Sequence, residues 1–138
     1  MSTHSRIGII NPDGTIRSIY CHFDGYPEGV GLALSNGYTD VDKINKLLDL
    51  GDISCIGPEP ESKSEYWDFD FSSPYRECTR AYRDRGEDCP AYIDENEENF
   101  WSRNTEYKYL FYPELKEWKV IGPYGREEHW LEEYLKNN

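Results

Sequence analysis

Two short runs rich in residues that favour β-strands lie near the start of the chain, and a turn sequence separates them. The first run covers residues 6–10, the second covers residues 15–23, and Asn11-Pro12-Asp13-Gly14 lies between them. These four residue types are the ones that tight turns favour. The pattern therefore predicts a β-hairpin over about 6–23.

The second run also predicts which side chains share a face, because successive residues of a strand point to opposite sides. We expect the core face to consist of Ile19, Cys21 and Phe23. The opposite face would carry Ile16, Ser18, Tyr20 and His22, with Asp24 close to the same side.

A helical period replaces the alternation in the next part of the chain. Apolar residues recur there at the spacing of one helix face, at Val41, Ile44, Leu47 and Leu48. Thr39 or Asp40 would cap this helix and Gly51 would end it, so a helix is predicted over about 40–50.

Further helices are predicted over about 27–35, which begins at Pro27, and over about 126–136. A second hairpin is predicted over about 106–121. Together these elements predict one α+β domain over residues 1–138, in which helices pack on a mainly antiparallel sheet built on the two hairpins.

Composition narrows the classes of partner. The 138 residues carry a net charge of −12, with 37% hydrophobic and 15% aromatic residues. Direct binding to nucleic acid is disfavoured because nucleic acids are polyanions, whereas a partner with a basic surface would be attracted. The four cysteines form no C-x-x-C pair, and we expect neither a metal nor a cofactor. Without a long apolar run or a secretory signal, we expect a cytoplasmic protein with no membrane contact.

The segment around the end of the first hairpin carries the first group of candidate ligand-binding residues. They are Tyr20, His22, Asp24 and Tyr26. His22 and Asp24 could share a proton, as in a small hydrolase, or could contact a ligand. They could equally hydrogen-bond locally and hold the corner between strand and helix. We expect no catalytic residue here, because no activated nucleophile accompanies the pair.

The second group lies in the segment RECTRAYRDRGED, where positive and negative charges balance. Its candidates are Arg80, Tyr82, Arg83 and Arg85. A predicted strand over about 78–82 would place Arg80 and Tyr82 on one face, as a platform for an anion and a ring. Pairing of the arginines with acids of the same chain is the alternative.

A third group could bind a partner protein. Acidic and aromatic residues are interleaved in the loop predicted over 57–75, at Glu65, Tyr66, Trp67, Asp68, Phe69 and Asp70. Aromatic residues anchor many protein interfaces, and the acids would suit a basic surface. The rings could instead pack on the core of their own domain.

Several motifs together resemble a family of small acidic proteins encoded by bacteriophages, prophages and other mobile elements. They are SRIGIINPDGTIRSIYCHFDGYPEGVG, LLDLGDIS, AYRDRGED and EYKYLFY…EWKV, in that order. The chain departs from the family pattern at Phe23, where tryptophan is expected, and the loop at 57–75 and the last helix lie outside the resemblance. The resemblance implies an accessory phage protein in a bacterial cytoplasm and carries over no catalytic residue.

Three functions follow as hypotheses. The first is a non-catalytic binder or inhibitor of a host protein with a basic surface, such as a nuclease or a defence effector. The second is a protein that sequesters a nucleotide or another small anionic ligand, a role compatible with a homo-oligomer. The third is a small hydrolase that uses His22 and Asp24.

Overall fold

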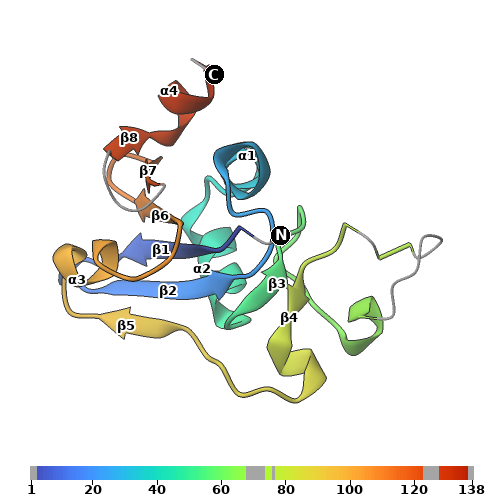
Figure 1. The fold of residues 1–138 in the computed structure, drawn as a ribbon. Coiled ribbons are helices and arrows are strands. Elements are labelled where there is room, and N and C mark those ends of the chain that lie inside the picture. Colours follow the sequence, from blue (N-terminus) through green and yellow to red (C-terminus); the bar gives the residue numbers. More distant parts are fainter. Residues whose placement is uncertain (1–2, 68–73, 76, 123–127, 137–138) are drawn as a thin grey trace.

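The computed structural model describes residues 3–67, 74–75, 77–122 and 128–136. Over these residues an eight-stranded sheet is flanked by four α-helices, which confirms the predicted α+β class (Figure 1). The strands are β1 (Ser5–Ile10), β2 (Ile16–Cys21), β3 (Ile53–Cys55), β4 (Arg80–Ala81), β5 (Tyr92–Asp94), β6 (Tyr107–Tyr112), β7 (Glu117–Ile121) and β8 (Glu128–Trp130). The α-helices are α1 (Leu32–Gly37), α2 (Val41–Asp49), α3 (Glu97–Trp101) and α4 (Leu131–Lys136).

Both predicted hairpins are present, and they lie side by side in the sheet. β1 pairs antiparallel with β2 and β6 pairs antiparallel with β7, while a parallel pairing of β1 with β6 joins the two hairpins. The strand order is β4-β3-β2-β1-β6-β7-β8, and β5 pairs with β2. Among the described strands, β2 and β3 form the second parallel pair. The sheet is therefore mixed rather than mainly antiparallel. The parallel pairings were not predicted, because contacts between distant segments leave no local pattern in the sequence.

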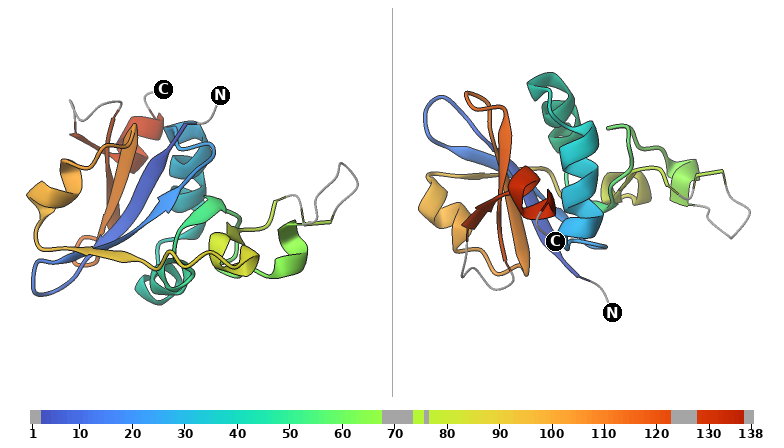
Figure 2. Two further views of the ribbon diagram at one scale, coloured as in Figure 1. Left: turned by 60° about the horizontal axis from the view of Figure 1, so that its bottom comes forward. Right: turned by 90° about the horizontal axis from the view of Figure 1, so that it is seen from above.

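One face of the sheet is covered by α1, α2 and α4 and carries the main core (Figure 2). Ile7, Ile19 and Tyr109 project from the central strands into this core and are fully buried. As predicted, α2 presents Ile44, Leu47 and Leu48 to the core. Its first turn is capped by Asp40, whose carboxylate accepts a hydrogen bond from the Lys43 N–H at 3.2 Å.

The opposite face of the sheet is covered at one end by α3 (Figure 2). Phe100 of this helix packs on Ile16 and Leu110 in a second, smaller apolar cluster. Gly8 belongs to β1, which lies between β2 and β6. A Cβ at this position would come within 3.1 Å of the Phe100 ring, so the glycine allows the ring to pack closely on the sheet. Beyond this cluster the same face carries polar and charged side chains.

The prediction that Phe23 faces the core is wrong. β2 ends at Cys21, and the Phe23 side chain is 43% exposed. The backbone leaves the strand here because the Phe23 N–H donates to the Ser54 carbonyl and Asp24 adopts a left-handed conformation with φ of 57°. The alternation that places Ile19 and Cys21 in the core therefore ends at Cys21 and does not extend to Phe23.

Other elements differ from the prediction in their detail. The helix expected over 27–35 consists of a π-helical turn, Pro27–Gly31, which continues directly into α1. The strand expected over 78–82 is shorter, because the chain enters a 3₁₀ helix at Tyr82. Of the helix expected over 126–136, residues 126–127 lie outside the described residues, residues 128–130 form β8, which pairs with β7, and α4 begins only at Leu131.

Candidate functional site

A groove of about 820 Å³ opens where β2 ends and the first helical segment begins. Its walls come from four segments of the chain: the turn after β2, the α1 helix, β3 with the residues that follow it, and the start of β4 with Glu77 before it. The described residues that line it are Phe23, Asp24, Ala33, Asn36, Gly37, Ser54, Cys55, Ile56, Gly57, Pro58, Glu77 and Arg80. The corner singled out in the sequence therefore borders an open cleft.

Backbone contacts hold the turn after β2 at the groove. The N–H groups of His22 and Phe23 donate to the carbonyls of Ile53 and Ser54, at 3.1 and 2.9 Å. The Asp24 carbonyl accepts the Val30 N–H at 2.8 Å. These bonds hold Asp24 in its left-handed conformation, which aspartate and asparagine tolerate better than other residues with a side chain.

The glycines of this corner allow close packing of the helical segment on the turn. A Cβ at Gly29 would lie 2.3 Å from the Asp24 carbonyl oxygen, closer than atoms can approach. A Cβ at Gly31 would lie 3.0 Å from a methyl group of Leu131 and 3.3 Å from the Tyr109 ring. The need for close approach explains why the helix begins with residues of low helix propensity.

Arg80 lies in the wall of the groove with its side chain buried. Its Nε donates to the Tyr66 carbonyl at 2.7 Å, its Nη2 donates to the Tyr75 carbonyl at 2.8 Å, and its Nη1 contacts the Cys55 Sγ at 3.1 Å. Burial raises the pKa of the Cys55 thiol, and the charge of Arg80 opposes this effect in part. The guanidinium is thus occupied by protein groups, whereas Asp24 and Glu77 are exposed at the rim.

The other arginines of the second group interact with neighbouring side chains. The Arg85 guanidinium lies over the rings of Trp67 and Tyr82, at 4.4 and 5.1 Å from their centroids. It also bonds Glu87 at 2.6 Å, while Arg83 lies 3.8 Å from an Asp84 oxygen. Because a 3₁₀ helix begins at Tyr82, the structure does not form the predicted platform of Arg80 and Tyr82 on one strand face.

Tyr20 and His22 lie together on the face of the sheet away from α1 and α2. The Tyr20 hydroxyl and the His22 Nδ1 are 2.9 Å apart, and burial raises the pKa of Tyr20 to about 12. The His22 ring stacks on the ring of His4, with 4.6 Å between their centroids. Within the described residues, no hydrogen bond or ion pair joins His22 to Asp24, which instead contacts the Tyr26 hydroxyl at 3.4 Å.

The partner-binding candidates that the structure describes are tied to their own domain. The Tyr66 hydroxyl donates to Glu61 at 2.9 Å, and the Trp67 indole N–H donates to the Ala81 carbonyl at 3.0 Å. Glu65 accepts a hydrogen bond from the Tyr75 hydroxyl at 3.3 Å. The remaining candidates of this group, Asp68, Phe69 and Asp70, lie outside the described residues.

Sequence reasoning missed the groove walls formed by Ile56, Glu77 and the α1 residues. It also missed the neighbours of Tyr20 and His22 on the sheet, namely His4 and Arg6. The paired alternation of the first hairpin could have identified His4 and Arg6, since they lie opposite strand β2. The walls of the groove had no such signal, because segments far apart in the sequence build it.

In the part of the chain that the structure describes, no group of three or more His, Cys, Asp or Glu side chains is placed to hold a metal ion. None of the described helices has the length and apolar character that a bilayer crossing requires. No model of a known protein family, no curated protein and no solved structure matches the chain.

Proposed function

We propose that this chain is a non-catalytic binding protein that engages a cationic surface of a partner protein through the groove at the end of β2. The observation that carries the proposal is the exposed Phe23 ring, which lines the groove together with the carboxylates of Asp24 and Glu77. An exposed aromatic side chain beside acidic groups suits a partner segment that is both apolar and basic.

Charge complementarity supports a cationic occupant. The net charge of −12 attracts a basic partner over a distance, and the exposed charges of the groove have the same sign. Arg80 does not cancel them at the rim, because its guanidinium is buried and bonded to backbone carbonyls. A phosphate or another anion would be repelled at this position.

The chemistry of the lining supports binding rather than catalysis. The described residues that line the groove include no histidine to serve as a general base. Cys55 lines it, but burial raises the pKa of its thiol and so keeps it in the less nucleophilic protonated form. The resemblance to proteins of bacteriophages suggests a host protein as the partner, for example one whose basic surface otherwise binds nucleic acid.

A photocrosslinking experiment tests this proposal. Benzoylphenylalanine would replace Phe23 in one sample and Leu115, an exposed residue of a distant turn, in a control. After irradiation in a bacterial lysate, we expect one basic protein to be captured from position 23 and not from position 115. The captured protein, once purified, should bind the unmodified chain more weakly as salt increases, because salt screens the charges.

Charge variants provide the matched test of the groove. Asp24→Asn combined with Glu77→Gln removes both rim charges, and asparagine tolerates the left-handed backbone of position 24. We expect this double variant to bind the purified partner at least tenfold more weakly. Glu95→Gln combined with Glu98→Gln makes the same charge change at exposed positions around the start of α3, on the opposite face of the sheet, and should leave the affinity within twofold. Equal effects of the two pairs would refute the groove as the binding site.

A further inference from the structure

Strand β5 forms an open margin of the sheet. Among the strands that the structure describes, β5 pairs only with β2, and Figure 1 shows it at the border of the sheet. Its three residues, Tyr92, Ile93 and Asp94, lie opposite three residues of β2 in an antiparallel register. The outer side of such a strand presents backbone N–H and C=O groups with which a further strand can pair.

The register shows which backbone groups point outward. In the first hairpin the Asn11 N–H donates to the Thr15 carbonyl at 2.8 Å, so the odd-numbered residues of β2 direct their backbone groups toward β1. Ser18 therefore directs its backbone groups toward β5, where it lies opposite Tyr92. The next residue of β5 has the reverse orientation. The N–H and C=O groups of Ile93 thus point away from β2, to the outer edge.

The side chains of this edge are apolar and exposed. The exposed fractions of Tyr92 and Ile93 are 55% and 52%, and the two side chains lie on opposite faces of the strand. Edge strands commonly carry lysine or proline, which prevent pairing with another chain, and β5 carries neither. Both the backbone and the side chains of β5 therefore suit the addition of a strand.

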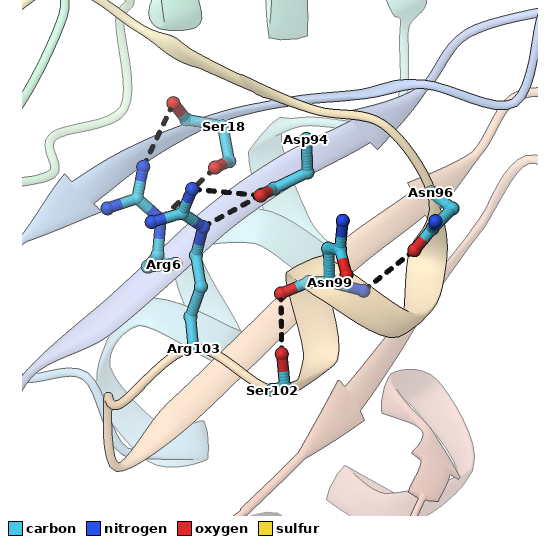
Figure 3. A network of polar contacts seen from close by, with 7 residues as sticks. All are labelled: Arg6, Ser18, Asp94, Asn96, Asn99, Ser102 and Arg103. Carbon is cyan, nitrogen blue, oxygen red and sulfur yellow. Dashed lines mark hydrogen bonds and ion pairs between the residues drawn. The ribbon is translucent and has the colours of Figure 1, made fainter.

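The Tyr92 ring is fixed in place by the chain itself. The Arg103 guanidinium lies over this ring, 4.1 Å from its centroid. The same guanidinium donates two hydrogen bonds to Asp94, both at 2.8 Å (Figure 3). A ring that is already held loses little conformational freedom when a partner binds, and this favours the contact.

The residues on either side of β5 determine the charge of a suitable partner. Residues 86–102 include acidic side chains before and after the strand and contain no lysine or arginine. Asp88, Glu95 and Glu98 are exposed, and none forms an ion pair within the described part of the chain. The arginine of β2 and the arginine that follows α3 are already paired with aspartates. An apolar centre with negative charge at both ends is the result.

We propose that β5 is a docking edge for an extended segment of another protein, in which lysine or arginine residues flank apolar ones. The segment would join the sheet as a further strand through main-chain hydrogen bonds to Ile93. Its apolar side chains would pack on Tyr92 and Ile93, and its basic residues would face the acidic flanks. This edge is separate from the groove at the end of β2, and the proposal does not depend on the partner proposed for that groove.

Charge argues against a second copy of this chain as the occupant. Antiparallel pairing of two β5 strands would bring two acidic segments together, in a chain whose net charge is −12. Like charges across paired strands destabilise a sheet. We therefore expect sedimentation to show no dimer that Ile93→Lys dissociates, and such a dimer would overturn the choice of occupant.

A synthetic peptide tests the edge directly. The probe is the capped, fluorescently labelled peptide Lys-Arg-Val-Thr-Val-Arg-Lys, and fluorescence anisotropy measures its binding to the full chain. We expect saturable binding to the wild type and about tenfold weaker binding to Ile93→Lys, which removes an apolar contact and repels the peptide. Leu115→Lys makes the same charge change at an exposed residue of a distant turn and should leave the affinity within twofold. Equal weakening in the two variants, or no saturable binding to the wild type, would overturn the proposal.

Methylation of the peptide backbone tests strand addition on the unaltered protein. One probe carries an N-methyl group at its threonine, and a second carries it at the valine that follows. Neighbouring N–H groups of a strand point to opposite sides, so only one of the two methylated probes should lose binding. The parent peptide should also slow hydrogen exchange of the Ile93 amide. If both methylated probes bound as tightly as the parent, backbone pairing would be excluded.

Charge variants separate this edge from the groove. Glu95→Gln combined with Glu98→Gln should weaken binding of the parent peptide about fivefold, because two exposed charge contacts are lost. Asp24→Asn combined with Glu77→Gln makes the same charge change at the groove and should leave the peptide affinity within twofold. A larger effect of the groove pair than of the β5 pair would assign the peptide to the groove and refute the docking edge.

Discussion

At the scale of single residues, Phe23 and Ile19 show how sharply exposure changes along one strand. Ile19 lies in the centre of β2 and is fully buried in the main core, whereas the Phe23 ring is 43% exposed at the groove. Both side chains are apolar, and the alternation of the strand would place both on the same face. The difference arises because the backbone turns away from β2 immediately after Cys21.

This difference predicts unequal effects of truncation on stability. Ile19→Ala should lower the free energy of unfolding by about 3 kcal/mol, because it leaves a cavity in a packed core. Phe23→Ala should lower it by less than about 1 kcal/mol, because much of the ring already contacts water. Urea denaturation of the two variants measures both values. If Phe23→Ala destabilised the fold as much as Ile19→Ala, the exposed position of the ring would be wrong.

At the scale of elements, α3 and β5 depend on tertiary contacts for their formation. α3 has five residues, and isolated helices of this length do not form in water. Asn96 caps it by accepting the Asn99 N–H at 2.8 Å (Figure 3). Phe100 of the same helix packs against the sheet. The paired hydrogen bonds from Arg103 to Asp94 join the end of this helical segment to the end of β5.

We expect the Asp94–Arg103 pair to stabilise this attachment measurably. A double-mutant cycle with Asp94→Ala and Arg103→Ala should give a coupling energy of about 1–2 kcal/mol, less than for a fully buried pair because Arg103 remains partly exposed. The exposed pair of Arg85 and Glu87 serves as the control and should give less than about 0.5 kcal/mol. Equal coupling in the two cycles would show that burial of Asp94 adds nothing to the interaction.

At the scale of the whole molecule, buried tyrosines make stability depend on alkaline pH. Burial raises the pKa of Tyr20 to about 12 and raises the pKa values of Tyr38, Tyr109 and Tyr112 as well. The hydroxyls of Tyr38 and Tyr109 donate to the carbonyls of Gly57 and Gly25, at 2.8 and 2.7 Å. In the unfolded chain these hydroxyls would ionise at their ordinary pKa of about 10.

The free energy of unfolding should therefore fall as the pH rises from 10 to about 12. Over this window the unfolded chain releases tyrosine protons that the folded chain retains, so deprotonation favours unfolding. Below pH 10 both states keep these protons and the contribution is fully present. Urea unfolding midpoints at pH 8, 10 and 11, with tyrosinate absorbance recorded in parallel, measure the effect. Stability that stayed constant to pH 11 would contradict the burial of these hydroxyls.

Local elements were the part of the fold that sequence reasoning predicted well. The turn after residue 10 and the cap at Asp40 depend on the preferences of a few adjacent residues, and both appear where they were expected. The placement of Tyr20 on the face opposite Ile19 was also correct, because alternation is a local property of a strand. The exposed Phe23 was not predicted, since the strand ends through a hydrogen bond to distant Ser54.

The sequence by itself determined the turns, the helix caps and the sidedness of the strands, because short-range backbone preferences and side-chain spacing decide them. Only the tertiary structure decided that β1 pairs with β6 and that β3 lies beside the end of β2. The first pairing joins the two hairpins into one sheet, and the second leaves Phe23 at an open groove. Pairings between distant segments depend on the free energy of the whole fold, and no short stretch of sequence contains that information.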